Sequence, residues 1–147
     1  MAYHYVDSGL DNVYLENGYI EHETAYGKAI SIQDTEGLHK ALGQWLVALP
    51  KPLNGAELRF LRLEMEMTQR SLASVFCSEE QNVRRWEKAR TKPVPGPVDM
   101  LLRVLYSEYV GGDGSVRHMV DRLALLDQID RAEARVREGC NGWRIAA

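Results

Sequence analysis

Seven residues between positions 81 and 92 have side chains suited to binding nucleic acid. They are Gln81, Asn82, Arg84, Arg85, Lys88, Arg90 and Lys92. Arginine can donate two hydrogen bonds to guanine, glutamine can do the same with adenine, and lysine neutralises phosphates. Such residues are also common on the solvated face of an ordinary helix, so their spacing decides what they indicate.

The spacing places most of these residues on one face of a helix predicted over residues 79–89. Successive residues of a helix are turned by about 100°. If Val83 and Trp86 point inward, the outward stripe consists of Gln81, Arg85 and Lys88, flanked by Arg84 and Lys92. The arginines and Gln81 then suit base edges, whereas the lysines and Arg90 suit phosphates.

A second short helix is predicted directly before it, over residues 68–76. Thr68 and Ser78 are residues of the type that caps a helix N-terminus, one before each helix. The inner face of the first helix consists of Leu72, Ala73, Val75 and Phe76. Two short amphipathic helices joined by a tight turn are typical of a helix-turn-helix.

The residues at the ends and in the middle of this segment also follow a specific pattern. The matching pairs are Thr68-Gln69, Leu72-Ala73 and Trp86-Glu87. In identity and separation they resemble the Xre/Cro-type helix-turn-helix of transcriptional regulators. The resemblance implies that Gln69 contacts the DNA backbone from a helix N-terminus and that Trp86 belongs to the core. Cys77 and Ser78 depart from the family, which usually has glycine and an aliphatic residue in the turn.

The following residues 91–106 are similar to the DNA-binding half of MqsA-type antitoxins, and this resemblance covers residues 53–110. In those antitoxins a zinc domain held by cysteines precedes this half and blocks a toxin. Here residues 1–50 contain no cysteine. The resemblance therefore implies a zinc-free replacement domain, and binding of a toxin is expected by analogy alone.

The rest of the chain predicts an α+β protein in three parts. Residues 1–50 are expected to form a small antiparallel sheet, with a hairpin at Asn17-Gly18, a third strand over 27–32 and a helix from Asp34 or Thr35 to Pro50 that covers the sheet. Residues 51–110 form the all-α helix-turn-helix domain, with further helices over 55–66, capped by Asn54, and 97–109. Residues 111–147 are expected to form an extension with a helix over 115–138.

Composition excludes several classes of protein. Residues 1–50 hold seven acidic residues and two lysines, whereas residues 51–110 hold ten basic and eight acidic residues, so DNA binding is expected in the middle. The two cysteines, Cys77 and Cys140, and the four scattered histidines have no metal-ligand spacing, and we expect no metal or cofactor. No apolar run suits a membrane and the start resembles no signal peptide, so a cytoplasmic location is expected.

Three functions compete. The first is a homodimeric autorepressor that binds double-stranded DNA at an inverted repeat and serves as the antitoxin of a toxin-antitoxin system. The second is an enzyme, which we do not expect, because Glu21, His22 and Glu23 are consecutive strand residues that point to alternate faces. The third is a protein-interaction module that keeps the helix-turn-helix without binding DNA.

The dimer contact has two candidates. One is the helix over 97–109, through Leu101, Leu105 and Tyr109. The other is the apolar stripe of the C-terminal helix, through Met119, Leu123, Leu126 and Ile129, although this stripe could equally fold back on its own domain.

Overall fold

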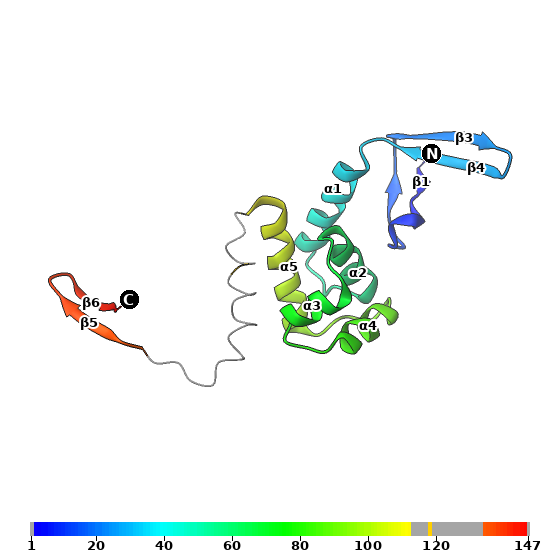
Figure 1. The fold of residues 1–147 in the computed structure, drawn as a ribbon. Helices are drawn as coiled ribbons and strands as arrows, with labels where there is room; N and C mark the ends of the chain where they lie inside the picture. Colours follow the sequence, from blue (N-terminus) through cyan, green and yellow to red (C-terminus); the bar gives the residue numbers. More distant parts are fainter. Residues whose placement is uncertain (1, 113–117, 119–133, 147) are drawn as a thin grey trace.

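The computed structural model describes residues 2–112, 118 and 134–146. Its elements follow the expected α+β order, with small antiparallel hairpins first, five helices in the middle and a hairpin last (Figure 1). The N-terminal elements are β1 (Tyr3–His4), a 3-10 turn η1 (Val6–Ser8), β2 (Tyr14–Leu15), β3 (Tyr19–Thr24) and β4 (Gly27–Ile32). The remaining elements are α1 (Thr35–Ala48), α2 (Gly55–Glu64), α3 (Gln69–Val75), α4 (Glu80–Lys88), α5 (Gly96–Gly111), β5 (Val136–Gly139) and β6 (Gly142–Ile145).

The N-terminal strands form two separate hairpins. β1 pairs with β2, and β3 pairs with β4. The predicted hairpin at Asn17-Gly18 is therefore wrong: Gly18, with φ of +79°, lies in a turn that leads from one hairpin to the next. The reason is a nonlocal pairing, since Leu15 lies opposite Tyr3 and is buried there. The strand predicted over 27–32 is confirmed as β4.

Helix α1 begins where expected and packs differently from the prediction. The Asp34 carboxylate accepts a hydrogen bond from the backbone N–H of Gly37 at 3.1 Å and caps the helix. The main packing partners of α1 are α2 and α5, whereas the prediction placed its apolar stripe on the strands. Gly43 allows the close approach, because a Cβ atom there would collide with the Tyr106 side chain of α5. Leu46 is completely buried in this contact region.

One hydrophobic core runs across the boundary predicted at residue 50. It joins the first hairpin, α1 and the helices that follow, through residues that include Tyr5, Leu15, Leu46, Leu61, Leu72, Val83 and Tyr106. At the start of α2, Asn54 accepts from the N–H of Glu57 while the Glu57 carboxylate accepts from the N–H of Asn54, each at 2.9 Å. This capping box confirms the expected cap at Asn54.

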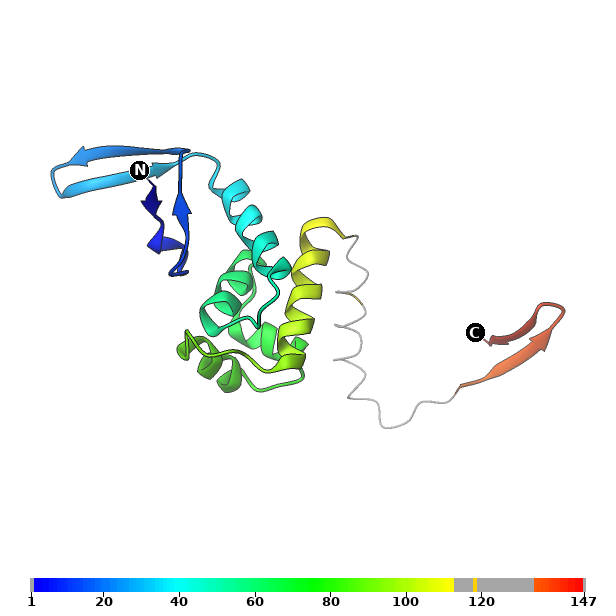
Figure 2. The same ribbon diagram turned by 180° about the vertical axis from the view of Figure 1, so that it is seen from behind.

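The C-terminal segment ends in strands. β5 and β6 pair as an antiparallel hairpin that stands apart from the helices, as the view from behind also shows (Figure 2). The helix predicted over 115–138 is thus wrong for Val136 to Glu138, which belong to β5. Most of that predicted helix, including the stripe from Met119 to Ile129, lies outside the described residues. None of the helices that the structure describes is both long and apolar enough to cross a membrane.

Candidate nucleic-acid interface

The turn between α3 and α4 is built around a residue with left-handed backbone. Thr68 caps α3, as predicted, by accepting from the N–H of Ser71 at 3.0 Å. After α3, Cys77 has φ of +52°, and the N–H of Ser78 donates to the carbonyl of Ala73 at 2.8 Å. This is the helix-ending motif in which glycine is the usual left-handed residue. Cys77 therefore occupies the glycine position of the turn with a cysteine side chain.

The start of α4 differs by one residue from the prediction. Glu79 is the N-cap residue and its side chain makes no capping hydrogen bond, so the expected cap at Ser78 is wrong. The Ser78 hydroxyl instead accepts from the Asn82 side-chain amide at 2.8 Å. The physical reason is the use of the Ser78 backbone to close α3, which moves the beginning of α4 one residue along the chain.

The inner faces of α3 and α4 agree with the predicted helix phase. Val83 is completely buried, and the inner residues of α3 are buried or half-buried: Leu72, Ala73, Val75 and Phe76. Trp86 is half-buried, and its ring meets the ring of Phe76 edge-on with centroids 6.4 Å apart. Trp86 thus lies at the rim of the core, whereas Val83 lies at its centre.

The outer face of α4 is exposed and basic. Its exposed residues are Gln81, Arg84, Arg85 and Lys88, and Lys92 is exposed in the loop that follows. Arg84 forms an ion pair with Glu80 at 3.0 Å, and Arg85 donates to the side-chain carbonyl of Asn82 at 3.1 Å. Asn82 is half-buried, so it orients Arg85 from below. The structure therefore brings together the residues of the predicted stripe on one accessible face.

A buried ion pair that the sequence reasoning missed holds α4 against α2. The Arg62 guanidinium donates to both carboxylate oxygens of Glu87, at 2.7 and 2.9 Å, and to the carbonyl of Met67 at 2.9 Å. The amide of Gln69 donates to the same carboxylate at 3.3 Å. Gln69 was expected to contact the DNA backbone, and here its side chain links the start of α3 to the end of α4. The sequence signal for this pair is the carboxylate of Glu87, which stands at an inward position one turn after Val83.

A shallow hollow of about 460 Å³ lies beside this ion pair. Its lining residues are Arg59, Gln69, Arg84, Glu87, Lys88 and Arg90. Three of its four cations have a carboxylate partner, since Arg59 lies 3.8 Å from Glu87, Arg84 pairs with Glu80 and Arg90 pairs with Asp11. Glu87 is shared with Arg62, and Lys88 has no ion pair within the described residues, so the hollow keeps a positive excess. An open hollow with several guanidinium and ammonium groups suits a phosphate group.

Arg90 connects this hollow to the N-terminal segment. Its guanidinium donates to the carbonyl of Gly9 at 3.0 Å and to the carboxylate of Asp11 at 2.9 Å. Both sides of this ion pair are substantially exposed, so its contribution to stability is small. The contact nevertheless places an acidic segment at one end of the basic face, a relationship that linear sequence could not predict.

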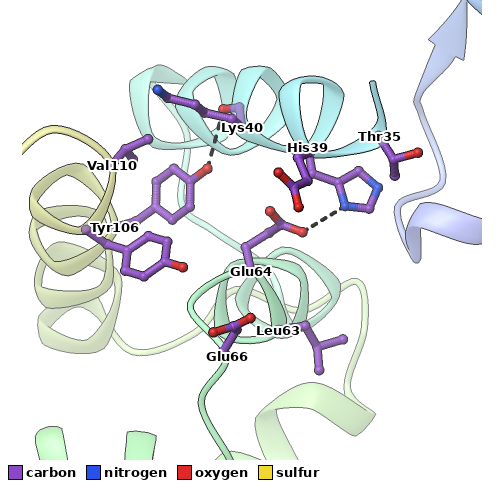
Figure 3. Close-up of a pocket in the computed structure, with 10 residues that line it drawn as sticks. Thr35, His39, Lys40, Leu63, Glu64, Glu66, Tyr106 and Val110 are labelled. Atoms are coloured by element: carbon purple, nitrogen blue, oxygen red, sulfur yellow. Dashed lines mark hydrogen bonds and ion pairs between the residues drawn. The ribbon is translucent and has the colours of Figure 1, made fainter. Parts of the chain in front are cut away.

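A second, larger hollow of about 660 Å³ lies between α1, α2 and α5 (Figure 3). On its wall the His39 ring bonds through Nδ1 to the Glu64 carboxylate at 2.8 Å and through Nε2 to the Tyr5 hydroxyl at 2.9 Å. The Tyr106 hydroxyl donates to the Lys40 carbonyl at 3.4 Å. These contacts connect three helices with the first hairpin.

Two tyrosines of this region, Tyr5 and Tyr106, have a raised pKa. Burial raises the pKa of Tyr5, and the carboxylates of Asp7 and Glu64 raise it further. Burial also raises the pKa of Tyr106, with Glu64 as the next cause. A tyrosine whose ionised form is disfavoured acts as a hydrogen-bonding residue of the fold.

The candidate acid and base residues of β3 do not converge. In the register of β3 and β4, Glu21 and Glu23 lie on one face and His22 lies on the other, and all three are exposed. Within residues 2–112, 118 and 134–146, no group of three or more histidine, cysteine or acidic residues is arranged to hold a metal ion.

The geometry of α3 and α4 therefore presents a basic helix face on a helix-turn-helix scaffold. Comparison of the chain with protein-family models, with curated proteins and with solved structures found no match.

Proposed function

We propose that this protein is a sequence-specific transcriptional regulator that inserts α4 into the major groove of double-stranded DNA. The observation that carries the proposal is the exposed face of α4, on which Gln81, Arg84, Arg85 and Lys88 project together. The major groove is about 12 Å wide and admits one α-helix with side chains of this kind. Behind that face, Val83 and the Glu87 ion pair fix the helix to α2 and α3.

Different residues have different roles in this proposal. Arg85, oriented by Asn82, and Gln81 at the start of α4 contact base edges. Lys88, Lys92 and the basic hollow beside Glu87 contact phosphates, and thereby set the position of α4 on the duplex. Gln69 acts on this contact by holding the Glu87 carboxylate, and Arg90 is shared between phosphate and Asp11.

We further propose that the protein binds an inverted repeat as a homodimer, because a nine-residue helix contacts too few base pairs for useful specificity. The structure changes which residues of α5 are available for the dimer contact. Leu105 is buried and Leu101 is packed against the core, so neither is available to a partner. The large apolar side chains that α5 exposes are Met100, Val104 and Tyr109.

The antitoxin role is a proposal about the N-terminal hairpins. Their exposed aromatic and aliphatic side chains, Tyr14, Ile20 and Tyr26, lie on a segment rich in acidic residues. Such a surface suits a basic partner protein such as a toxin, and the Arg90 contact connects it to the DNA-binding face.

Selection from a library of randomised duplexes tests the function directly. The full chain is expected to enrich one sequence, with half-sites whose centres lie about 10 base pairs, or about twice that, apart. Footprinting on the enriched duplex is expected to protect major-groove positions in both half-sites. Enrichment of no sequence above the starting library would contradict the proposal.

A further inference from the structure

The C-terminal hairpin has two chemically different faces. In its register Val136 lies opposite Ile145, Arg137 opposite Arg144, and Glu138 opposite Trp143. Since side chains alternate along a strand, one face carries Val136, Glu138, Trp143 and Ile145. The other face carries Arg137 and Arg144, and the same alternation adds Arg135, whose carbonyl continues the ladder by accepting from the N–H of Ala146. All three arginines are exposed.

The arrangement of Arg137 and Arg144 is unfavourable for the hairpin alone. Like charges directly opposite each other destabilise a strand pair, and a two-stranded hairpin without further support is at best marginally stable in water. In the part of the chain that the structure describes, neither Arg137 nor Arg144 forms an ion pair with a carboxylate. A ligand with closely spaced negative charges would relieve this repulsion.

From this register we infer that the hairpin, Val136 to Ile145, is a second DNA contact that binds the phosphate backbone through Arg137 and Arg144. The inference rests on the proposed DNA-binding function and extends it beyond the helix-turn-helix. Guanidinium groups form bidentate hydrogen bonds with phosphate oxygens, and duplex DNA presents such oxygens on neighbouring nucleotides. Arg135, on the same face, adds to the local positive field.

The length of chain before the hairpin permits this contact. Residues 113–133 separate Gly112, directly after α5, from Ala134 in the sequence, and 21 residues can span at most about 70 Å. Two half-site centres one helical turn apart are separated by roughly 34 Å. The hairpin can therefore reach backbone that flanks the segment bound by α4.

The charges on β3 favour DNA over pairing of the C-terminal hairpin with this strand of a second copy. The most acidic strand of the N-terminal hairpins is β3, in which Glu23 already lies opposite Lys28. In β3 this leaves Glu21 as the one carboxylate without a cation opposite it, which is too few to neutralise both Arg137 and Arg144. A continuous row of phosphates is the better complement to Arg137 and Arg144.

The experiment measures the dissociation constant of the full chain on its selected duplex, and on a random duplex, over a series of salt concentrations. For the double variant Arg137→Ala/Arg144→Ala, log K is expected to depend less steeply on log salt, by about two units of slope for each bound protomer and so by about four for the proposed homodimer. Affinity at 0.1 M salt should fall by roughly tenfold for each arginine that no longer binds a phosphate, to the same extent on both duplexes. The matched control Arg137→Lys/Arg144→Lys keeps both charges and should keep the wild-type slope.

Two results would overturn the inference while leaving the proposed function intact. One is an unchanged slope for Arg137→Ala/Arg144→Ala, when Lys88→Ala measured in parallel does lower it. The other is a change of oligomeric state by light scattering at an unchanged slope, which would assign the hairpin to contact between copies. Failure of the wild-type chain to bind either duplex would instead defeat the proposed function, and the inference with it.

Discussion

Arg62 and Glu87 form a two-pronged ion pair inside the protein, with guanidinium nitrogens 2.7 and 2.9 Å from the two carboxylate oxygens. Arg62 belongs to α2 and Glu87 to α4, so the pair fixes α4 to the helix that precedes α3. Both side chains are buried, which makes each of them costly to leave without its partner.

Truncation of either partner is expected to destabilise the fold strongly. Arg62→Ala or Glu87→Ala leaves an uncompensated buried charge, and the free energy of unfolding in urea should fall by about 3 to 5 kcal/mol. The control is the exposed pair on the same helix, where Arg84→Ala should cost less than about 0.5 kcal/mol. Equal effects of Glu87→Ala and Arg84→Ala would contradict the buried position of this ion pair.

Cys77→Gly is expected to stabilise the protein. The left-handed backbone of Cys77 is unfavourable for a residue with a Cβ atom by about 1 to 2 kcal/mol, and glycine would relieve this strain. Part of the resulting stabilisation is offset by the greater conformational freedom of glycine in the unfolded chain. The net increase in the free energy of unfolding should be roughly 0.5 to 1 kcal/mol. The exposed Cys140 has no such backbone strain, so Cys140→Gly is the matched control and should give no gain.

Gly55→Ala is expected to destabilise the contact between the start of α2 and the end of α4. A Cβ atom at Gly55 would collide with the carbonyl oxygen of Trp86, which is backbone and cannot move aside freely. Thermal unfolding should show a loss of roughly 1 to 3 kcal/mol. Gly96→Ala, in the first turn of α5 with open space around it, should be close to neutral, and a similar loss there would show that the effect is not steric.

Local signals in the sequence predicted much of this fold. The caps at Asn54 and Thr68 and the inward positions of Leu72 and Val83 depend on neighbours within one or two turns of the same helix, which the sequence displays directly. The same holds for the outward stripe of α4, which follows from its period. The face of α4 that we propose as the DNA contact could therefore be predicted from the sequence, whereas the contacts around it could not.

The errors have physical causes of two kinds. Asn17-Gly18 does form a turn, but the strands on either side of it do not pair with each other. Leu15 pairs instead with Tyr3, a residue distant in sequence, and is buried there. At the C-terminus the alternation from Val136 to Ile145, with glycines on either side of a two-residue turn, was itself a hairpin signal. The helical period of the preceding residues, when extended through this segment, predicts a helix instead.

The ion pair between Arg62 and Glu87 is a contact that the sequence alone could not predict. Each residue stands at an inward position of its helix, which marks it as a charged residue in a core. The sequence alone cannot say which charges meet, since the two residues are 25 positions apart. The contact of Arg90 with Asp11 across 79 positions was hidden for the same reason.

Residues assigned to bases and to phosphates should differ in their effect on specificity. Arg85→Ala and Gln81→Ala are each expected to cost about 1 to 3 kcal/mol on the selected duplex and little on random DNA. Lys88→Ala and Lys92→Ala should weaken binding to both duplexes equally. Fluorescence anisotropy with the two duplexes in parallel makes the comparison, and equal losses on both duplexes for Arg85→Ala would remove it from base contact.

The most direct test of DNA binding is the salt dependence of the affinity of the full wild-type chain for its selected duplex. If α4 and the basic hollow neutralise at least about five phosphates in each bound dimer, log K should fall linearly with log salt, with a slope of roughly −4 or steeper. A protein-interaction module without a DNA function would show dissociation constants above about 0.1 mM on every duplex, even at about 50 mM salt. That second result would contradict the account given for α4.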